Sequence, residues 1–200
     1  LVRRLLEKGA EPDPLNREQH EFPFPLHVAV MIQTDTEIVR ALLEEGANSD
    51  NEVDLRHLYR PYNKETKYPF DASPTPLYIA AAEGYIDTVK VLLEYESLPF
   101  INAQITHGGS PLYGAAQNGH AEVVKLLLAE GADPNVRNYG ADDTPLYAAA
   151  ENGHLSVVTV LLRSRPNMDL EQTADSADIA YKNKHIEVGD LLADYIEDRL

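Results

Sequence analysis

The chain of 200 residues contains no cysteine. This absence excludes disulfide bonds, thiolate nucleophiles and zinc sites built on sulfur, and it is typical of a protein in a reducing compartment. No apolar run reaches the roughly 18 residues that a membrane-spanning helix needs, so we expect no membrane insertion. The first ten residues mix Arg3, Arg4 and Lys8 with leucines and do not resemble a signal peptide. These features predict a cytoplasmic protein.

Basic residues are also scarce. There are 17 Lys and Arg residues against 33 Asp and Glu residues, which leaves a net charge of -16. Such a chain repels nucleic-acid phosphates and anionic lipid at long range. We therefore expect no nucleic-acid binding, and we expect a protein partner with a basic patch. The alternative is an acidic surface that only keeps the protein dispersed in water.

The chain repeats itself with a period near 34 residues. Thr75, Ser110 and Thr144 each begin a similar motif, in which Pro-Leu-Tyr is followed by an alanine-rich stretch, and they lie 35 and 34 residues apart. Each motif runs on through a glycine to a stretch of valines and leucines, and an earlier copy begins at Phe24. A period of this length indicates a solenoid of stacked structural units.

Each copy is expected to form a helix, a tight turn, a second helix and a loop. The hydroxyl residue that opens the motif suits a helix N-cap, and the following proline suits the first helical position. Gly84, Gly119 and Gly153 supply the positive φ that ends the first helix. The second helix has an apolar face too wide for one repeat to bury, so stability must come from stacking on neighbouring repeats.

The motif in its best-formed copy, Thr144-Pro145-Leu146 with Gly153-His154 and Leu161-Leu162, resembles the ankyrin consensus. The resemblance implies an all-α ankyrin-repeat solenoid of stacked helix-turn-helix units, with β-hairpin or loop fingers and a concave face that binds proteins. Tyrosine replaces the consensus histidine at positions 78, 113 and 147, and only His27 retains it. That variant resembles arrays of intracellular bacteria and also some long fungal or invertebrate arrays. The bacterial resemblance implies an effector that captures a host protein in the host cytosol.

We predict a single ankyrin-repeat domain over residues 1–200. Its expected parts are a partial repeat at 1–14, repeats at 22–50, 74–102, 103–135 and 136–169, an inserted loop at 51–73, and a degenerate C-terminal capping repeat at 170–200. Because the chain begins in mid-repeat, a longer parent protein is expected. The alternative function is then a substrate-positioning domain of a larger enzyme whose catalytic part lies outside this chain.

The chain itself is not expected to be an enzyme or to bind a metal or cofactor. His120, His154 and His185 recur at one repeat position, where a structural role in the turn explains them. No HExxH motif, phosphate-binding glycine motif or serine nucleophile motif is present. The stretch from Asp133 to Thr144 is interpreted as a finger loop, because it has threonine where a calcium loop needs glutamate.

The inserted loop is the first candidate for partner binding. It concentrates tyrosine and basic residues in an acidic chain, and these types are enriched at binding hot spots. Its candidate residues are Arg56, Tyr59, Arg60 and Tyr62. The alternative is that its aromatic residues fold back to cover the gap between two imperfectly spaced repeats.

The second candidate surface consists of variable positions at the ends of the first helices together with the finger tips. The family geometry leaves these positions free, so specificity can be encoded there. They are Met31, Glu83, Gln117, Asn118, Glu151 and Asn152, with Thr106, His107, Tyr139, Asp142 and Asp143 in the fingers. Self-association through the apolar residues of the first helix, Leu1, Val2, Leu5 and Leu6, is a further alternative and is not favoured.

Overall fold

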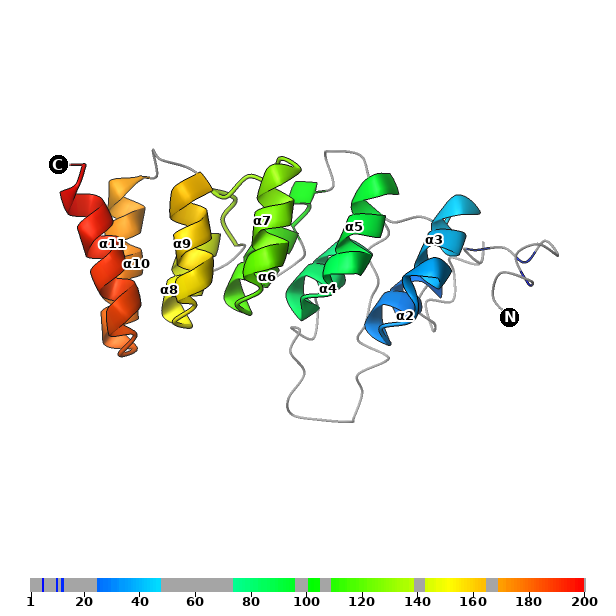
Figure 1. Cartoon of the computed structure of the whole chain (residues 1–200), viewed down its shortest axis with the longest axis horizontal. Coiled ribbons are helices and arrows are strands. Elements are labelled where there is room, and N and C mark those ends of the chain that lie inside the picture. Colours follow the sequence, from blue (N-terminus) through cyan, green and yellow to red (C-terminus); the bar gives the residue numbers. More distant parts are fainter. Residues whose placement is uncertain are drawn as a thin grey trace.

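The computed structural model describes residues 25–47, 74–95, 101–104, 109–138, 143–164 and 169–199, together with residues 5, 10 and 12. The described residues contain ten helices, which form five consecutive pairs (Figure 1). The pairs are α2 (Pro25–Met31) with α3 (Thr36–Glu44), α4 (Pro76–Glu83) with α5 (Ile86–Tyr95), α6 (Pro111–Gln117) with α7 (Ala121–Ala129), α8 (Pro145–Glu151) with α9 (Leu155–Ser164), and α10 (Leu170–Lys182) with α11 (Ile186–Glu197).

The helices form two layers that run the length of the molecule (Figure 1). The first helices of the pairs contact one another in order, from α2 through α4, α6 and α8 to α10. The second helices do the same, from α3 through α5, α7 and α9 to α11. Each described pair therefore packs mainly on its neighbours in the row, as in a solenoid. The predicted all-α repeat solenoid is confirmed.

The predicted starts and ends of the first helices are also confirmed. Thr75, Ser110 and Thr144 are the N-caps, and each side-chain oxygen accepts a hydrogen bond of 3.2 Å from the backbone N–H three residues later. Proline then occupies the first turn, where the missing N–H removes no helical bond. Each helix ends before a glycine with φ between 74° and 81°. A side chain would be strained in that conformation.

The core lies between the two layers. The leucine that follows the first proline of α2, α4, α6 and α8 is at most 1% exposed, and the alanines of these four helices are almost fully buried. Small side chains let adjacent first helices approach closely, while valine and leucine of the second helices fill the space behind them. Leu92, Leu127 and Leu161 are each 0% exposed. This continuous core contributes most of the stabilisation that one repeat alone could not supply.

The last helix pair departs from the others. Asp175 and Ser176 stand where the preceding repeat has Thr144 and Pro145, so no proline starts the first helix there. The helix instead begins at Leu170, with Asp169 as N-cap, and reaches 13 residues against seven for α8. The N-terminal end of α10 therefore extends beyond that of α8.

Candidate functional site

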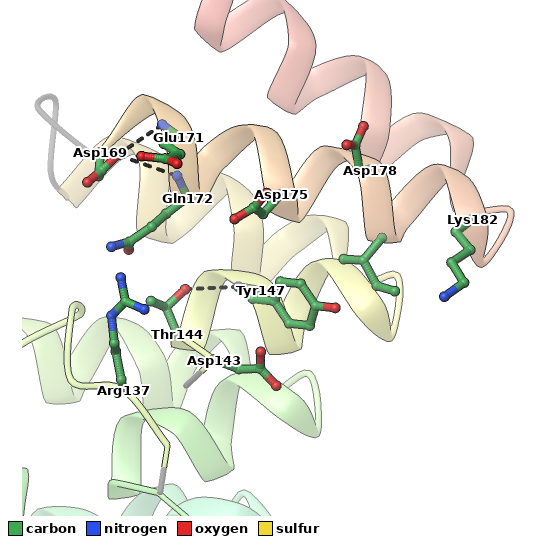
Figure 2. A pocket seen from close by; sticks show the side chains of 11 residues that line it. Arg137, Asp143, Thr144, Tyr147, Asp169, Glu171, Gln172, Asp175, Asp178 and Lys182 are labelled. Carbon is green, nitrogen blue, oxygen red and sulfur yellow. Dashed lines mark hydrogen bonds between the residues drawn. The ribbon is translucent and has the colours of Figure 1, made fainter. Parts of the chain in front are cut away.

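A groove of about 650 Å³ lies between the last two first helices. We call it the α8–α10 groove. One side comes from the finger and the start of α8, and the other side comes from α10 (Figure 2). Its lining residues are Arg137, Asp143, Thr144, Tyr147, Asp169, Glu171, Gln172, Asp175, Asp178, Ile179 and Lys182. The long α10 of the last pair supplies most of them.

The α8–α10 groove is strongly acidic. Five of its lining residues are Asp or Glu and two are Arg or Lys. Asp169 is engaged as the N-cap of α10, where its carboxylate accepts hydrogen bonds from the backbone N–H of Glu171 at 2.9 Å and of Gln172 at 3.4 Å. Asp175 and Asp178 lie one helical turn apart and are both exposed. Carboxylates therefore face solvent along the middle of the groove.

Tyr147 supplies an aromatic ring to the α8–α10 groove. Its backbone N–H donates to the Thr144 side chain, which fixes the start of α8 beneath it (Figure 2). Partial burial raises the pKa of the Tyr147 phenol, and the nearby carboxylates of Asp143, Glu151 and Asp175 raise it further. The ring therefore stays neutral near neutral pH in a negative electrostatic environment, which favours a cation at its face.

Neighbouring repeats are tied together by histidines. The Nε2 atom of His120 lies 3.0 Å from the carbonyl oxygen of Ala82, and the Nε2 atom of His154 lies 3.0 Å from that of Gln117. A structural role for these residues was predicted, and these bonds confirm it. The contact runs to the preceding repeat, however, and not within the turn. These links hold the first helices at fixed spacing along the row.

Models of ankyrin repeats match residues 1–96, 54–138 and 115–162. The chain belongs to the ankyrin-repeat family. Ankyrin repeats generally act as protein–protein interaction modules. A search of curated proteins finds no match.

Several of the predicted partner-binding residues lie at the C-terminal ends of the first helices. Met31, Glu83, Gln117 and Glu151 are the last residues of α2, α4, α6 and α8. Gln117 is exposed, whereas Met31, Glu83 and Glu151 are half-buried. Met31 packs against the core of the array. The row therefore follows the ends of successive ankyrin first helices.

Two predicted residues also serve the ankyrin fold. The side-chain amide of Asn118 donates to the carbonyl oxygen of Gly114 at 2.9 Å, and that of Asn152 donates to Ala148 at the same distance. Both residues are C-caps, where the last helical carbonyls lack partners. The expectation that the fold leaves these two side chains free was wrong, because each one completes a helix end.

The ankyrin fingers are linked to each other in their described parts. The backbone N–H of Asn138 donates to the carbonyl oxygen of Asp143 at 2.8 Å, which closes one finger. Asn102 and Gln104 of the preceding finger bond to the backbone of Asp133 and Arg137. Among the predicted finger residues, Asp143 lies in the α8–α10 groove. The others, Thr106, His107, Tyr139 and Asp142, and the inserted-loop residues Arg56, Tyr59, Arg60 and Tyr62, lie outside the described residues.

Sequence reasoning missed most of the α8–α10 groove. Tyr147, Asp175 and Asp178 were not predicted as site residues. One signal was available, because Asp178 takes the position that tyrosine occupies in the three preceding repeats.

None of the described helices is long and apolar enough to cross a membrane. The described residues also contain no group of three or more His, Cys, Asp and Glu side chains placed to hold a metal ion.

Proposed function

We propose that the chain binds a protein partner across the face formed by its first helices and fingers, with the α8–α10 groove as the main contact. The observation that carries this proposal is the groove itself, where an aromatic ring and several carboxylates face solvent between two repeats. Hot spots of protein interfaces combine aromatic anchors with charged groups in such depressions. The row at the helix ends and the fingers extend the contact along the array.

The rigidity of the array supports this proposal. Histidine links between repeats, amide caps on the first helices and bonds between fingers hold the face in one arrangement. A face ordered in advance loses less conformational entropy when a partner binds. Binding therefore needs no folding step, and its affinity depends on side chains placed on a fixed frame.

The inserted loop and the finger tips remain part of the proposal. Arg56, Tyr59, Arg60 and Tyr62 combine aromatic and basic types, while the α8–α10 groove is acidic. The two arginines are cationic whereas the groove is acidic, so the two surfaces would select different regions of one partner. Thr106, His107, Tyr139 and Asp142 complete the proposed surface in the fingers.

Affinity capture with a groove variant and a matched control tests the proposal. The groove variant is Asp175→Lys with Asp178→Lys, and the control is Glu130→Lys with Glu197→Lys, which makes the same change of net charge at exposed residues outside the groove lining. A protein captured by the wild type should then be purified and titrated calorimetrically. We expect the groove variant to weaken its binding strongly and the control to leave it nearly unchanged. Equal affinity for both variants would show that the partner binds elsewhere.

A further inference from the structure

The tyrosines at one repeat position differ in exposure along the array. Tyr78 and Tyr113 are each 4% exposed, whereas Tyr147 is half-buried and lines the α8–α10 groove. The reason lies in the following repeat. Tyr78 lies over Gly114, where an added Cβ would come within 3.1 Å of its ring. The same position holds Ala148 in the next repeat and Ile179 in the last one, so the space for a ring decreases.

Among the described residues, the last helix pair places no tyrosine over the ring of Tyr147. The last pair has Asp178 at the tyrosine position, and Asp178 and Ile179 line the groove together with Tyr147. On the side formed by α10, one face of an aromatic ring is thereby left uncovered in an acidic groove. The exposure of Tyr147 follows from packing and is independent of the charges around it.

Carboxylates surround this ring on both sides of the groove. Asp175 extends from α10 and Asp143 from the finger side, with Tyr147 between them (Figure 2). Both raise the pKa of the Tyr147 phenol electrostatically, so both act on the same ring. The two cations of the lining, Arg137 and Lys182, lie towards opposite ends of the groove (Figure 2). The central part of the groove therefore attracts a positive group.

Guanidinium fits this arrangement better than ammonium. Its planar face stacks on an aromatic ring, and its edge donates paired hydrogen bonds to carboxylates. The chain contains such a pair already, because the guanidinium carbon of Arg199 lies 3.5 Å from the centre of the Tyr195 ring. A lysine ammonium offers a point charge and lacks the stacking plane. The groove volume of about 650 Å³ also lies in the range that accommodates small ligands and short peptide stretches.

On the basis of the proposed function, we infer that the α8–α10 groove binds an arginine side chain from an extended basic segment of the partner protein. The guanidinium stacks on the Tyr147 ring, and its N–H groups donate to the carboxylate of Asp175, while Asp143 adds negative charge on the other side of the ring. Asp178 adds a second charge for a neighbouring basic residue of the same segment. The groove thus binds arginine more tightly than lysine, and it binds basic side chains more tightly than neutral polar ones.

Short peptides test this inference directly. The probe is a peptide of alternating glycine and arginine, compared with counterparts that carry lysine or the neutral arginine isostere citrulline. Isothermal titration should show binding in the order arginine, lysine, citrulline. We expect arginine to bind about 2- to 5-fold more tightly than lysine, the range of a partly exposed cation–π contact. Equal affinity for arginine and citrulline would overturn the inference.

Variants identify which groups recognise the arginine. Tyr147→Leu should remove the preference for arginine over lysine, and Tyr147→Phe should keep it because the ring remains. Asp175→Asn should weaken both basic peptides, while Glu130→Gln should leave both unchanged. Circular dichroism and thermal unfolding confirm that each variant is folded. Binding that is insensitive to Asp175→Asn, or a preference that survives Tyr147→Leu, would contradict the inference.

Two further outcomes separate this inference from the proposed function. If no arginine peptide binds while the captured partner still needs Asp175 and Asp178, the partner uses the groove and the arginine inference is wrong. If light scattering shows that the protein dimerises and that Asp175→Asn returns it to a monomer, a second copy occupies the groove and the assigned occupant is wrong. If peptides bind in the stated order but no captured partner depends on the groove, the inference stands and the proposed function fails.

Discussion

His154 links its own repeat to the preceding one, with its Nε2 atom 3.0 Å from the carbonyl oxygen of Gln117. Its ring also lies against Gly119, where an added Cβ would come within 2.7 Å of the imidazole. Glycine at this position is therefore needed twice, once for its positive φ of 81° and once for the space that His154 occupies. The ring of His120 likewise lies against Gly84, and that of His185 against Gly153.

Gly119→Ala should destabilise the protein more than Gly131→Ala. Both glycines have positive φ, 81° and 94°, so substitution by alanine at either position should lower the free energy of unfolding of the protein by about 1 to 2 kcal/mol. Only Gly119 faces a histidine ring, since a Cβ at Gly131 would meet nothing within 4 Å. In Gly119→Ala, displacement of the His154 ring should lower the free energy of unfolding by about a further 1 to 3 kcal/mol. Urea unfolding measures the difference, and equal losses would show that the histidine contact contributes nothing.

Leu127→Ala should lower the free energy of unfolding by about 2 to 5 kcal/mol. Leu127 is 0% exposed in α7, between two neighbouring repeats, and truncation leaves a cavity that rigid helices cannot close. Lys125→Ala is the control on the same helix, because Lys125 is exposed and its truncation should change stability little. Denaturant unfolding of both variants checks this. A large loss for Lys125→Ala with a small loss for Leu127→Ala would mean that α7 faces the opposite way.

Glu94→Gln should destabilise the protein in a pH-dependent way. Two guanidinium nitrogens of Arg40 contact the Glu94 carboxylate, at 2.5 and 3.4 Å, and join α3 to α5. The hydrogen bond from Arg40 lowers the pKa of Glu94 below its ordinary value of 4.5. A lowered folded-state pKa means that the stabilisation is present above about pH 4.5 and disappears as pH falls through the folded-state value.

Thermal unfolding of the wild type and of Glu94→Gln should therefore differ at neutral pH and converge in acid. Added salt should narrow the neutral-pH difference, because both side chains are partly exposed. Glu130→Gln provides a matched loss of one exposed carboxylate away from Arg40. A wild-type advantage over Glu94→Gln that stays constant from neutral pH to well below pH 4.5 would argue against the ion pair.

Lys184→Gly should stabilise the last helix pair. Lys184 has φ 68° at the position where the three preceding repeats have Gly84, Gly119 and Gly153. The left-handed conformation costs an ordinary residue about 1 to 2 kcal/mol, and glycine removes this cost. The greater conformational freedom of glycine in the unfolded chain offsets about 0.5 to 1 kcal/mol of the resulting gain in stability. We expect a net increase of about 0.5 to 1 kcal/mol in unfolding free energy. Lys184→Ala keeps the strain and should give no increase, so equal gains for both variants would rule out the backbone explanation.

Much of the fold could be predicted because its signals are local. A hydroxyl residue followed by proline starts a helix wherever it stands, and Gly84, Gly119 and Gly153 end the first helices because only glycine adopts positive φ without strain. The repeat spacing then predicted the stacked pairs. Within the candidate site, Asp143 was predicted as a finger residue and does lie in the α8–α10 groove.

The groove as a whole could not be predicted in this way. Tyr78, Tyr113 and Tyr147 occupy one repeat position, but their exposure depends on what the following repeat places against them. That residue is a glycine for Tyr78 and an isoleucine for Tyr147. The three tyrosines are equivalent in the repeat pattern, but their packing environments differ.

The amino-acid sequence by itself determined the helix pairs, their turns and the order in which they stack, because caps, prolines and glycines act on the backbone within a few residues. The tertiary structure alone decided where the α8–α10 groove lies. The early start of α10 extends one wall of the groove, and the bulk of Ile179 leaves less room to bury the Tyr147 ring. Carboxylates from two separate chain segments line the same groove. Such a space depends on side-chain volumes from different repeats, and only the folded array brings them together.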